Sequence, residues 1–170
     1  DVPIVVANDG DVSALAGAMS LGAGCVMGLK GGGTAVLVIG LLGLFGALAL
    51  LTGGVFRMKK SVPSAACYVP AILYYVCKLF YDFRRWMHDP AILDYCFCLF
   101  ALICFMIATY HAASFSFDHG GRRRLCFYSL CGMFFGATAM AGQALPELLI
   151  YGASACVCLA YAMQALGNGK

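Results

Sequence analysis

Charged side chains are scarce in this sequence of 170 residues. They make up 11% of the chain, whereas about 25% is usual for soluble domains. A soluble globule of this size needs more polar side chains to cover its surface. The 11 Lys and Arg residues only slightly outnumber the 8 Asp and Glu residues, and they are scattered. This composition excludes a cytosolic enzyme, a nucleic-acid-binding domain and a disordered tail.

Motifs for catalysis and cofactor binding are also missing. The sequence has no G-x-S-x-G and no H-E-x-x-H, and residues 30–34 lack the order of a phosphate-binding loop. The three histidines, His88, His111 and His119, have no recognised spacing for zinc ligands. We therefore predict no catalytic residue, no metal site and no cofactor, and we favour a role other than that of an enzyme.

A disulfide or redox framework is not indicated either, although the chain has ten cysteines. None of them forms a C-x-x-C pair. The close pairs are Cys96/Cys98 and Cys156/Cys158, whose side chains would point about 200° apart on a helix. Most of the cysteines lie within apolar runs, which favours small buried thiols.

Long apolar runs are what the sequence has in abundance, since 62% of its residues are hydrophobic. A helix of about 20 such residues crosses the hydrocarbon core of a membrane. The runs predict an all-α, polytopic membrane bundle that forms a single domain over residues 1–170. Its spans are expected at residues 12–29, 34–56, 64–88, 90–114, 125–143 and 146–166. The first run is short and rich in small residues, so five spans result if it does not cross.

Two prolines indicate where helices begin. Asp89 supplies an N-cap before Pro90, which takes the first helical position, and Pro146 opens the last run with Glu147 in the first turn. Together with the polar residues between the runs, these signals leave only short connections.

The distribution of Lys and Arg predicts the orientation, because cytoplasmic loops carry the excess. Six crossings divide the positive residues into seven on one side and four on the other. This places both termini in the cytoplasm, with the cytoplasmic or plasma membrane as the expected location. The seven are Arg57, Lys59, Lys60, Arg122, Arg123, Arg124 and Lys170, and the four are Lys30, Lys78, Arg84 and Arg85.

Small residues at a spacing of four predict faces where helices pack closely. Gly24/Gly28 and Gly132/Gly136 fit the G-x-x-x-G pattern, which lets helix backbones approach in lipid. The pattern serves packing within the chain or association with a second copy or another membrane protein. Packing within the chain is the interpretation we favour.

The candidate ligand site is a polar seam at the end of the third run. At 100° per residue, Tyr74, Lys78, Tyr81 and Arg85 form one stripe, with Asp82 at its edge. Lys78 and Asp82 are spaced to form an ion pair. One hypothesis is an outward-facing pocket that receives an anionic group. The alternative, which we favour slightly, is an interfacial belt whose aromatic and basic residues contact lipid headgroups.

Asp94 is the sixth candidate, because it is an acidic residue about one turn inside the fourth run. A carboxylate at that depth is costly without a partner, and Lys78 or Arg85 on the preceding helix can supply one. The helix dipole is an equally good explanation, since an acid in the first turn is favoured.

Three functions fit these observations. The first is a membrane protein that binds or transports a small molecule through a pocket on the extracytoplasmic side. The second is a scaffold whose partner is another membrane protein. The third is a membrane-embedded enzyme acting on a lipid, with Asp82, His88, Asp89 and Asp94 as acid/base candidates. Membrane lipids are the expected environment of all three, and no nucleic acid is expected.

In size and layout, with Ala14 and Ala18 in an early A-x-x-x-A motif, the chain resembles the substrate-capturing subunits of energy-coupling-factor vitamin transporters. The resemblance implies a six-helix bundle with cytoplasmic termini. It identifies no ligand and no ligand-binding residue.

Overall fold

The protein is all-helical in the part of the chain that the structure describes. The structure is a computed structural model that describes residues 16–27, 34–58, 65–87, 92–115, 121–141 and 143–167, and for residues 35, 54–58, 65, 92–94 and 167 it describes the backbone alone. Six α-helices occupy these ranges. They are the first helix Ala16–Met27, α2 Thr34–Met58, α3 Val69–Trp86, α4 Ile92–Ser114, α5 Arg122–Ala139 and α6 Leu145–Gly167.

Three of these helices are long and apolar enough to cross a membrane. They lie within α2, α4 and α6, at Val36–Gly53, Tyr95–Ser114 and Leu145–Leu166. The charged residues of α3 and the three arginines that open α5 make these two helices more polar. The first helix is apolar but has fewer than 18 residues. Composition and length therefore support a membrane protein with three candidate spans.

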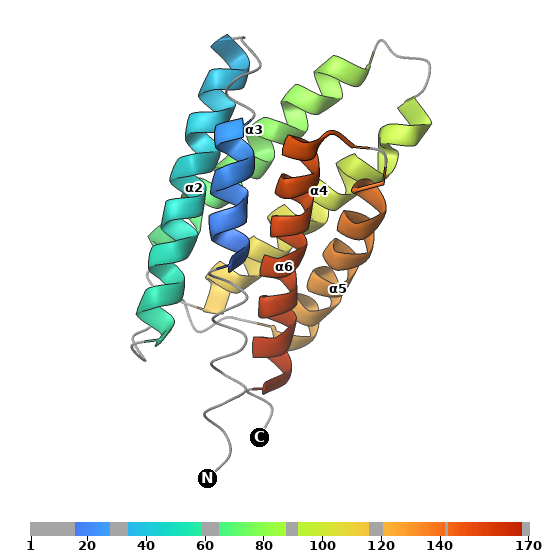
Figure 1. The fold of residues 1–170 in the computed structure, drawn as a ribbon. Coiled ribbons are helices and arrows are strands. Elements are labelled where there is room, and N and C mark those ends of the chain that lie inside the picture. Colours follow the sequence, from blue (N-terminus) through green and yellow to red (C-terminus); the bar gives the residue numbers. More distant parts are fainter. Residues whose placement is uncertain are drawn as a thin grey trace.

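Successive helices run in alternating directions. Figure 1 shows the first helix rising, α2 descending and the remaining helices alternating in the same way, so that the start of the first helix and the end of α6 lie at one end of the bundle. Contacts join α2 to α3, α3 to α4, α4 to α5 and α5 to α6, and α4 also contacts α6. Short connections force this antiparallel arrangement.

Two helices differ in extent from the expected runs. The third run was expected to be one helix over residues 64–88, but a 3-10 turn at Ala65–Cys67 precedes α3, which begins at Val69 with a proline in its first turn. The helix α5 begins at Arg122 rather than at residue 125, because arginine is a good helix former outside the hydrocarbon. The boundary expected at Asp89-Pro90 lies outside the described residues.

Glycines let the helices approach closely. A methyl group at Gly24 would lie 3.0 Å from Ile150 of α6, and one at Gly136 of α5 would lie 2.8 Å from the ring of Phe105 of α4. A methyl group at Gly132 would lie 3.1 Å from the sulfur of Cys158 of α6. These glycine faces are therefore covered within the chain. Gly28 lies outside the described residues.

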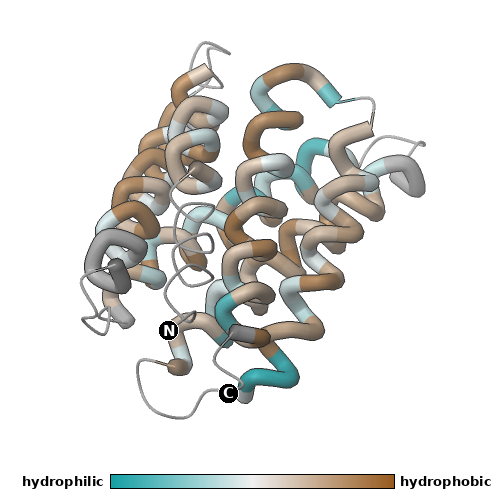
Figure 2. Tube along the Cα trace, turned by 60° about the horizontal axis from the view of Figure 1, so that its bottom comes forward, coloured by the Kyte–Doolittle hydropathy of each residue, from teal (hydrophilic) through white to brown (hydrophobic). Residues whose placement is uncertain are grey.

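Large apolar side chains cover the outside of the bundle. Figure 2 shows that hydrophobic residues make up most of the length of the helices, while the most hydrophilic residues lie mainly near the helix ends. Phe45, Phe80, Phe127 and Phe134 are each more than 60% exposed. An exposed aromatic surface of this kind is stable in lipid and costly in water.

Candidate functional site

The inner face of α3 is polar although it is buried. Its buried side chains are Ala71, Tyr74, Tyr75, Lys78 and Asp82, which recur at helical spacing. An apolar face would bury the same helix without desolvating a charge. The sequence of α3 thus places polar and ionisable groups inside the bundle, and each of them needs a partner there.

Lys78 lies at the centre of this arrangement and contacts two carboxylates. Its Nζ is 3.0 Å from Oδ2 of Asp82, one turn later on α3, and 2.9 Å from Oε2 of Glu147 in the first turn of α6. The side chains of Lys78 and Asp82 are 6% and 3% exposed, while that of Glu147 is 32% exposed. We call these three residues the polar centre.

The charges of the polar centre do not cancel. One ammonium faces two carboxylates, so the fully ionised cluster has a surplus negative charge. A buried charge costs several kcal/mol unless it is paired. Asp82 on the same helix and Glu147 on α6 supply this pairing, and the second contact also joins α3 to α6. Because Glu147 is partly exposed, it is the member of the polar centre that a molecule from the surroundings can contact.

The helix α6 contributes further polar groups next to the polar centre. The ring of Tyr151, one turn after Glu147, has its centroid 6.0 Å from Nζ of Lys78. One turn further, Ser154 accepts a hydrogen bond of 3.0 Å from the hydroxyl of Tyr75 and donates one of 2.8 Å to the carbonyl of Ile150. The buried contact between α3 and α6 is thus polar over several turns.

Two thiols lie at the edges of the site. Cys25 of the first helix donates to the hydroxyl oxygen of Tyr74 with a separation of 3.6 Å. Cys98 of α4 accepts from Nε2 of Gln143 at 3.5 Å. Both cysteines are buried. The first contact joins the first helix to α3, and the second joins α4 to the segment just before α6.

The structure brings together only part of the predicted ligand site. Tyr74, Lys78 and Asp82 are buried inside the bundle, and the i, i+4 pair between Lys78 and Asp82 is present. Tyr81 is half-buried and Arg85 is exposed. The buried face therefore ends at Asp82, because the true inner stripe is rotated slightly from the one expected.

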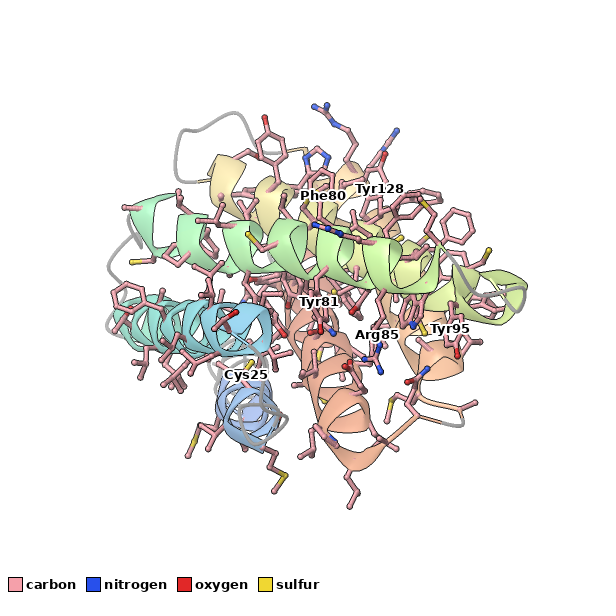
Figure 3. All side chains as sticks on the ribbon, turned by 90° about the horizontal axis from the view of Figure 1, so that it is seen from above. Cys25, Phe80, Tyr81, Arg85, Tyr95 and Tyr128 are labelled. Carbon is pink, nitrogen blue, oxygen red and sulfur yellow. The ribbon has the colours of Figure 1, made fainter. Side chains whose placement is uncertain are left out.

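Arg85 and Tyr81 nevertheless lie near the polar centre. Figure 3 shows both on the side of α3 that faces α6, whereas Phe80 points to the opposite side. The guanidinium of Arg85 interacts electrostatically with Asp82. The side chain of Asp94, which was expected to pair with Lys78 or Arg85, lies outside the described residues.

Glu147 is the member that the sequence did not assign to the cluster. The sequence placed it only in the first turn of the last helix, directly after Pro146. The proline at its side and its place in the first turn of a helix explain an acid at this position without any partner. The available signal was the helical spacing of Glu147, Tyr151 and Ser154 in an otherwise apolar run. Nothing local identifies Lys78 as the partner of Glu147.

Among the described residues, no group of three His, Cys, Asp or Glu side chains could hold a metal ion. Of the four acid/base candidates for a lipid enzyme, Asp82 is paired with Lys78, while His88, Asp89 and the side chain of Asp94 lie outside the described part of the chain.

Comparison with known proteins adds no family assignment. No protein-family model matches the chain, and neither a curated protein nor a solved structure matches it. The likeness to the vitamin-capturing subunits therefore stays a likeness of size and layout. Ala18 is fully buried, and Ala14 lies outside the described residues.

Proposed function

We propose that the chain is an integral membrane protein that binds or transports a small molecule at the polar centre. The observation that carries the proposal is the buried ammonium of Lys78, which contacts carboxylates on two different helices. Ionisable groups inside membrane bundles are costly, and they commonly mark the paths and binding sites of substrates and ions. In this proposal all six helices cross, and both termini are cytoplasmic.

The entrance in this proposal is at the end of the bundle where α3 ends and α6 begins. Glu147 is partly exposed there, and Arg85 lies on the same part of α3. The Lys and Arg count places this end on the extracytoplasmic side. A ligand arriving from outside would meet Glu147 before it reached the buried pair of Lys78 and Asp82.

The charge of the polar centre constrains the ligand. Lys78 is already neutralised by two carboxylates, so it attracts an anion weakly. A ligand with a positively charged or hydrogen-bond-donating group fits the surplus negative charge better. We therefore propose a ligand that is a cation or a hydrogen-bond donor. The stripe on α3, considered alone, favours an anion instead.

The alternatives have less support. The scaffold hypothesis relied on Gly24, Gly132 and Gly136, and all three contact other helices of the same chain. The lipid-enzyme hypothesis relied on carboxylates of which the described one, Asp82, is paired. Neither has an observation that favours it over small-molecule binding.

A thermal-shift screen of the detergent-purified protein tests the proposal. The panel contains amines, amino acids, vitamins, nucleobases, small anions and lipids. A ligand that binds only the folded state stabilises it by about 2.7 kcal/mol at a hundredfold excess over Kd. Trp86 is the only tryptophan of the chain and lies on α3, so its fluorescence gives a second readout.

Two variants decide whether a hit occupies the polar centre. Glu147→Gln keeps the size of the side chain but removes the surplus charge, and it should abolish the shift. The matched control is Arg84→Gln, which changes an exposed residue of α3. A ligand that shifts the unfolding temperature of Glu147→Gln as much as that of the parent contradicts binding at the polar centre. A screen in which no ligand shifts the unfolding temperature contradicts small-molecule binding.

A further inference from the structure

Three exposed arginines open α5. Arg122, Arg123 and Arg124 form the start of this helix, and its first turn contains no acidic residue. The carboxylates whose side chains the structure describes, Asp82 and Glu147, belong to the polar centre. Figure 1 shows that α5 begins at the end of the bundle opposite to the start of α6. No described carboxylate therefore balances the three charges, and we call these arginines the basic patch.

Aromatic side chains of two helices border the basic patch. A methyl group at Gly121 would lie 2.8 Å from Nε of Arg124, so this guanidinium folds back over the start of α5. It interacts electrostatically with the imidazole of His111 in the last turn of α4. That imidazole stacks on the ring of Tyr128 of α5, with centroids 5.4 Å apart, and the neighbouring Tyr110 is 60% exposed. Basic and aromatic groups of this kind collect at the level of lipid headgroups.

An exposed apolar stripe runs along α5 from the basic patch. Phe127, Leu130 and Phe134 follow Arg123 at spacings of four and three residues, so all four share one face of the helix. The three apolar side chains are 62%, 54% and 64% exposed. From Arg123 to Phe134 the helix rises about 16 Å, which is close to half of a hydrocarbon core about 30 Å thick. A basic end followed by an apolar stripe of this length matches the headgroup and acyl chain of one phospholipid.

We propose that the outer face of α5 binds an anionic phospholipid. Its phosphate pairs with the basic patch, and an acyl chain lies along the apolar stripe. Arginine suits this role because its guanidinium donates two parallel hydrogen bonds to a phosphate. The Lys and Arg count predicts that this end faces the cytoplasm, and anionic lipids are concentrated in the cytoplasmic leaflet. The lipid site is separate from the polar centre and does not depend on the function proposed for it.

Charge favours a lipid over a second copy of the chain at this face. Two copies that cross one membrane in the same orientation are related by an axis along the membrane normal, which would place the two basic patches against each other. Their like charges repel, whereas an anionic headgroup neutralises them. The orientation of the chain requires positive charge at this end, but it does not require an exposed apolar stripe aligned with that charge.

Lipid titration of the detergent-purified protein, followed by native mass spectrometry, tests the proposal. Dioleoyl phosphatidylglycerol is compared with dioleoyl phosphatidylcholine, which has the same acyl chains but no net charge. The parent protein should bind phosphatidylglycerol more tightly. Each basic residue near an anionic lipid strengthens binding about fivefold. Arg123→Gln should therefore lower the affinity for phosphatidylglycerol about fivefold, and Arg123→Gln with Arg124→Gln should lower it about 25-fold. The affinity for phosphatidylcholine should change little.

Matched variants separate the two parts of the site. Arg84→Gln removes an exposed arginine from α3, at the other end of the bundle, and should bind phosphatidylglycerol like the parent. Arg123→Lys with Arg124→Lys keeps the charge and should keep most of the preference for phosphatidylglycerol. Phe134→Ala should weaken binding several-fold, whereas Phe45→Ala, at an equally exposed position of α2, should not.

Three outcomes overturn the proposal. The first is equal affinity of the parent for the two lipids. The second is a preference for phosphatidylglycerol that persists unchanged in Arg123→Gln and in the double glutamine variant. The third is displacement of bound phosphatidylglycerol by inorganic phosphate, because the site would then take a free phosphate rather than a lipid. Loss of the preference in the glutamine variants and its retention in the lysine variant support an anionic lipid on α5.

Discussion

At the scale of single residues, Lys78 shows how a membrane protein can bury a charge. Its ammonium contacts Asp82 along α3 and Glu147 across the interface with α6. Removing one member of a buried ion pair leaves the other uncompensated, whereas replacing all members together is far less costly. The polar centre should therefore respond to substitution as a unit.

Lys78→Met should lower the free energy of unfolding by about 3–5 kcal/mol, because two carboxylates remain in the bundle without a cation. Adding Asp82→Asn and Glu147→Gln should recover most of this loss. Thermal unfolding in detergent measures both effects. Arg84→Met, at an exposed position of the same helix, is the control and should leave stability nearly unchanged. A Lys78→Met variant as stable as the parent would contradict the role of Lys78 as the cation that compensates the two carboxylates.

Residue-scale prediction from sequence succeeded where partners are local. The spacing of Lys78 and Asp82 indicated their ion pair, because residues four apart on a helix are neighbours. It did not identify Glu147 as a partner, since 69 positions of chain separate the two residues and only the packing of α6 on α3 brings them together.

At the scale of the elements, glycine decides how closely neighbouring helices can pack. A methyl group at Gly43 of α2 would overlap the sulfur of Cys25 and would lie 2.7 Å from the ring of Tyr74. One at Gly53, on the same helix, would meet only Cys67, at an ordinary 3.8 Å. Substitutions at these two positions thus distinguish the effect of close packing on stability from the effect of helix propensity.

Gly43→Ala should destabilise the protein by about 1–3 kcal/mol, because the first helix or α3 must move away from α2. Gly53→Ala should be neutral or stabilising by up to about 1 kcal/mol, since alanine favours a helix more than glycine does. Thermal unfolding of the two variants under one set of conditions compares them. Equal losses in both would show that close packing is not the role of Gly43.

Gly136 tests whether the glycines of α5 serve the chain or a partner. Gly136→Ala should lower the unfolding temperature to the same extent at every protein concentration, because the added methyl group meets Phe105 of the same chain. Ala137→Leu, at the exposed neighbouring position, is the control. A concentration-dependent loss, or a change of oligomeric state on size-exclusion chromatography, would instead indicate a second copy at this face.

Sequence reasoning predicted the elements better than their ends. Apolar length indicated α2, α4 and α6, because a long run with very few charges is buried in protein or lipid. It joined the 3-10 turn at Ala65–Cys67 to α3 and began α5 too late at residue 125. Hydropathy reports where lipid begins, whereas a helix continues into water as long as its backbone hydrogen bonds and caps allow.

At the scale of the whole molecule, alternating helices divide the connections between two ends. Gly121 lies before α5, next to three arginines, and Ala141 lies in the turn after it. If α5 crosses the membrane, these two positions lie on opposite sides. In that case the excess of Lys and Arg predicts that Gly121 is on the cytoplasmic side.

Reporter insertions test this topology. A fluorescent protein that matures in the cytoplasm should be active when inserted at Gly121 and inactive at Ala141, while a periplasmic phosphatase should show the opposite pattern. A fusion after Gly167 should behave like the insertion at Gly121, because α6 descends to the same end as the start of α5 (Figure 1). The same reporter activity at Gly121 and Ala141 would rule out a crossing by α5.

The sequence by itself indicated a membrane environment and the class of structure. Few charges and long apolar runs favour helices in lipid, because a helix satisfies its own backbone hydrogen bonds there. It also placed Lys78 and Asp82 on one face of one helix, because helical spacing is local.

Only the tertiary structure decided which groups meet. It turned the inner face of α3 toward α6, joined Glu147 to Lys78, and aligned Tyr75 with Ser154. It also covered Gly132 and Gly136 with Phe105 of α4. These contacts depend on the rotation and depth of each helix relative to its neighbours, and many side chains along the chain set them together. No local pattern can specify them, because each helix alone would be equally stable in any rotation.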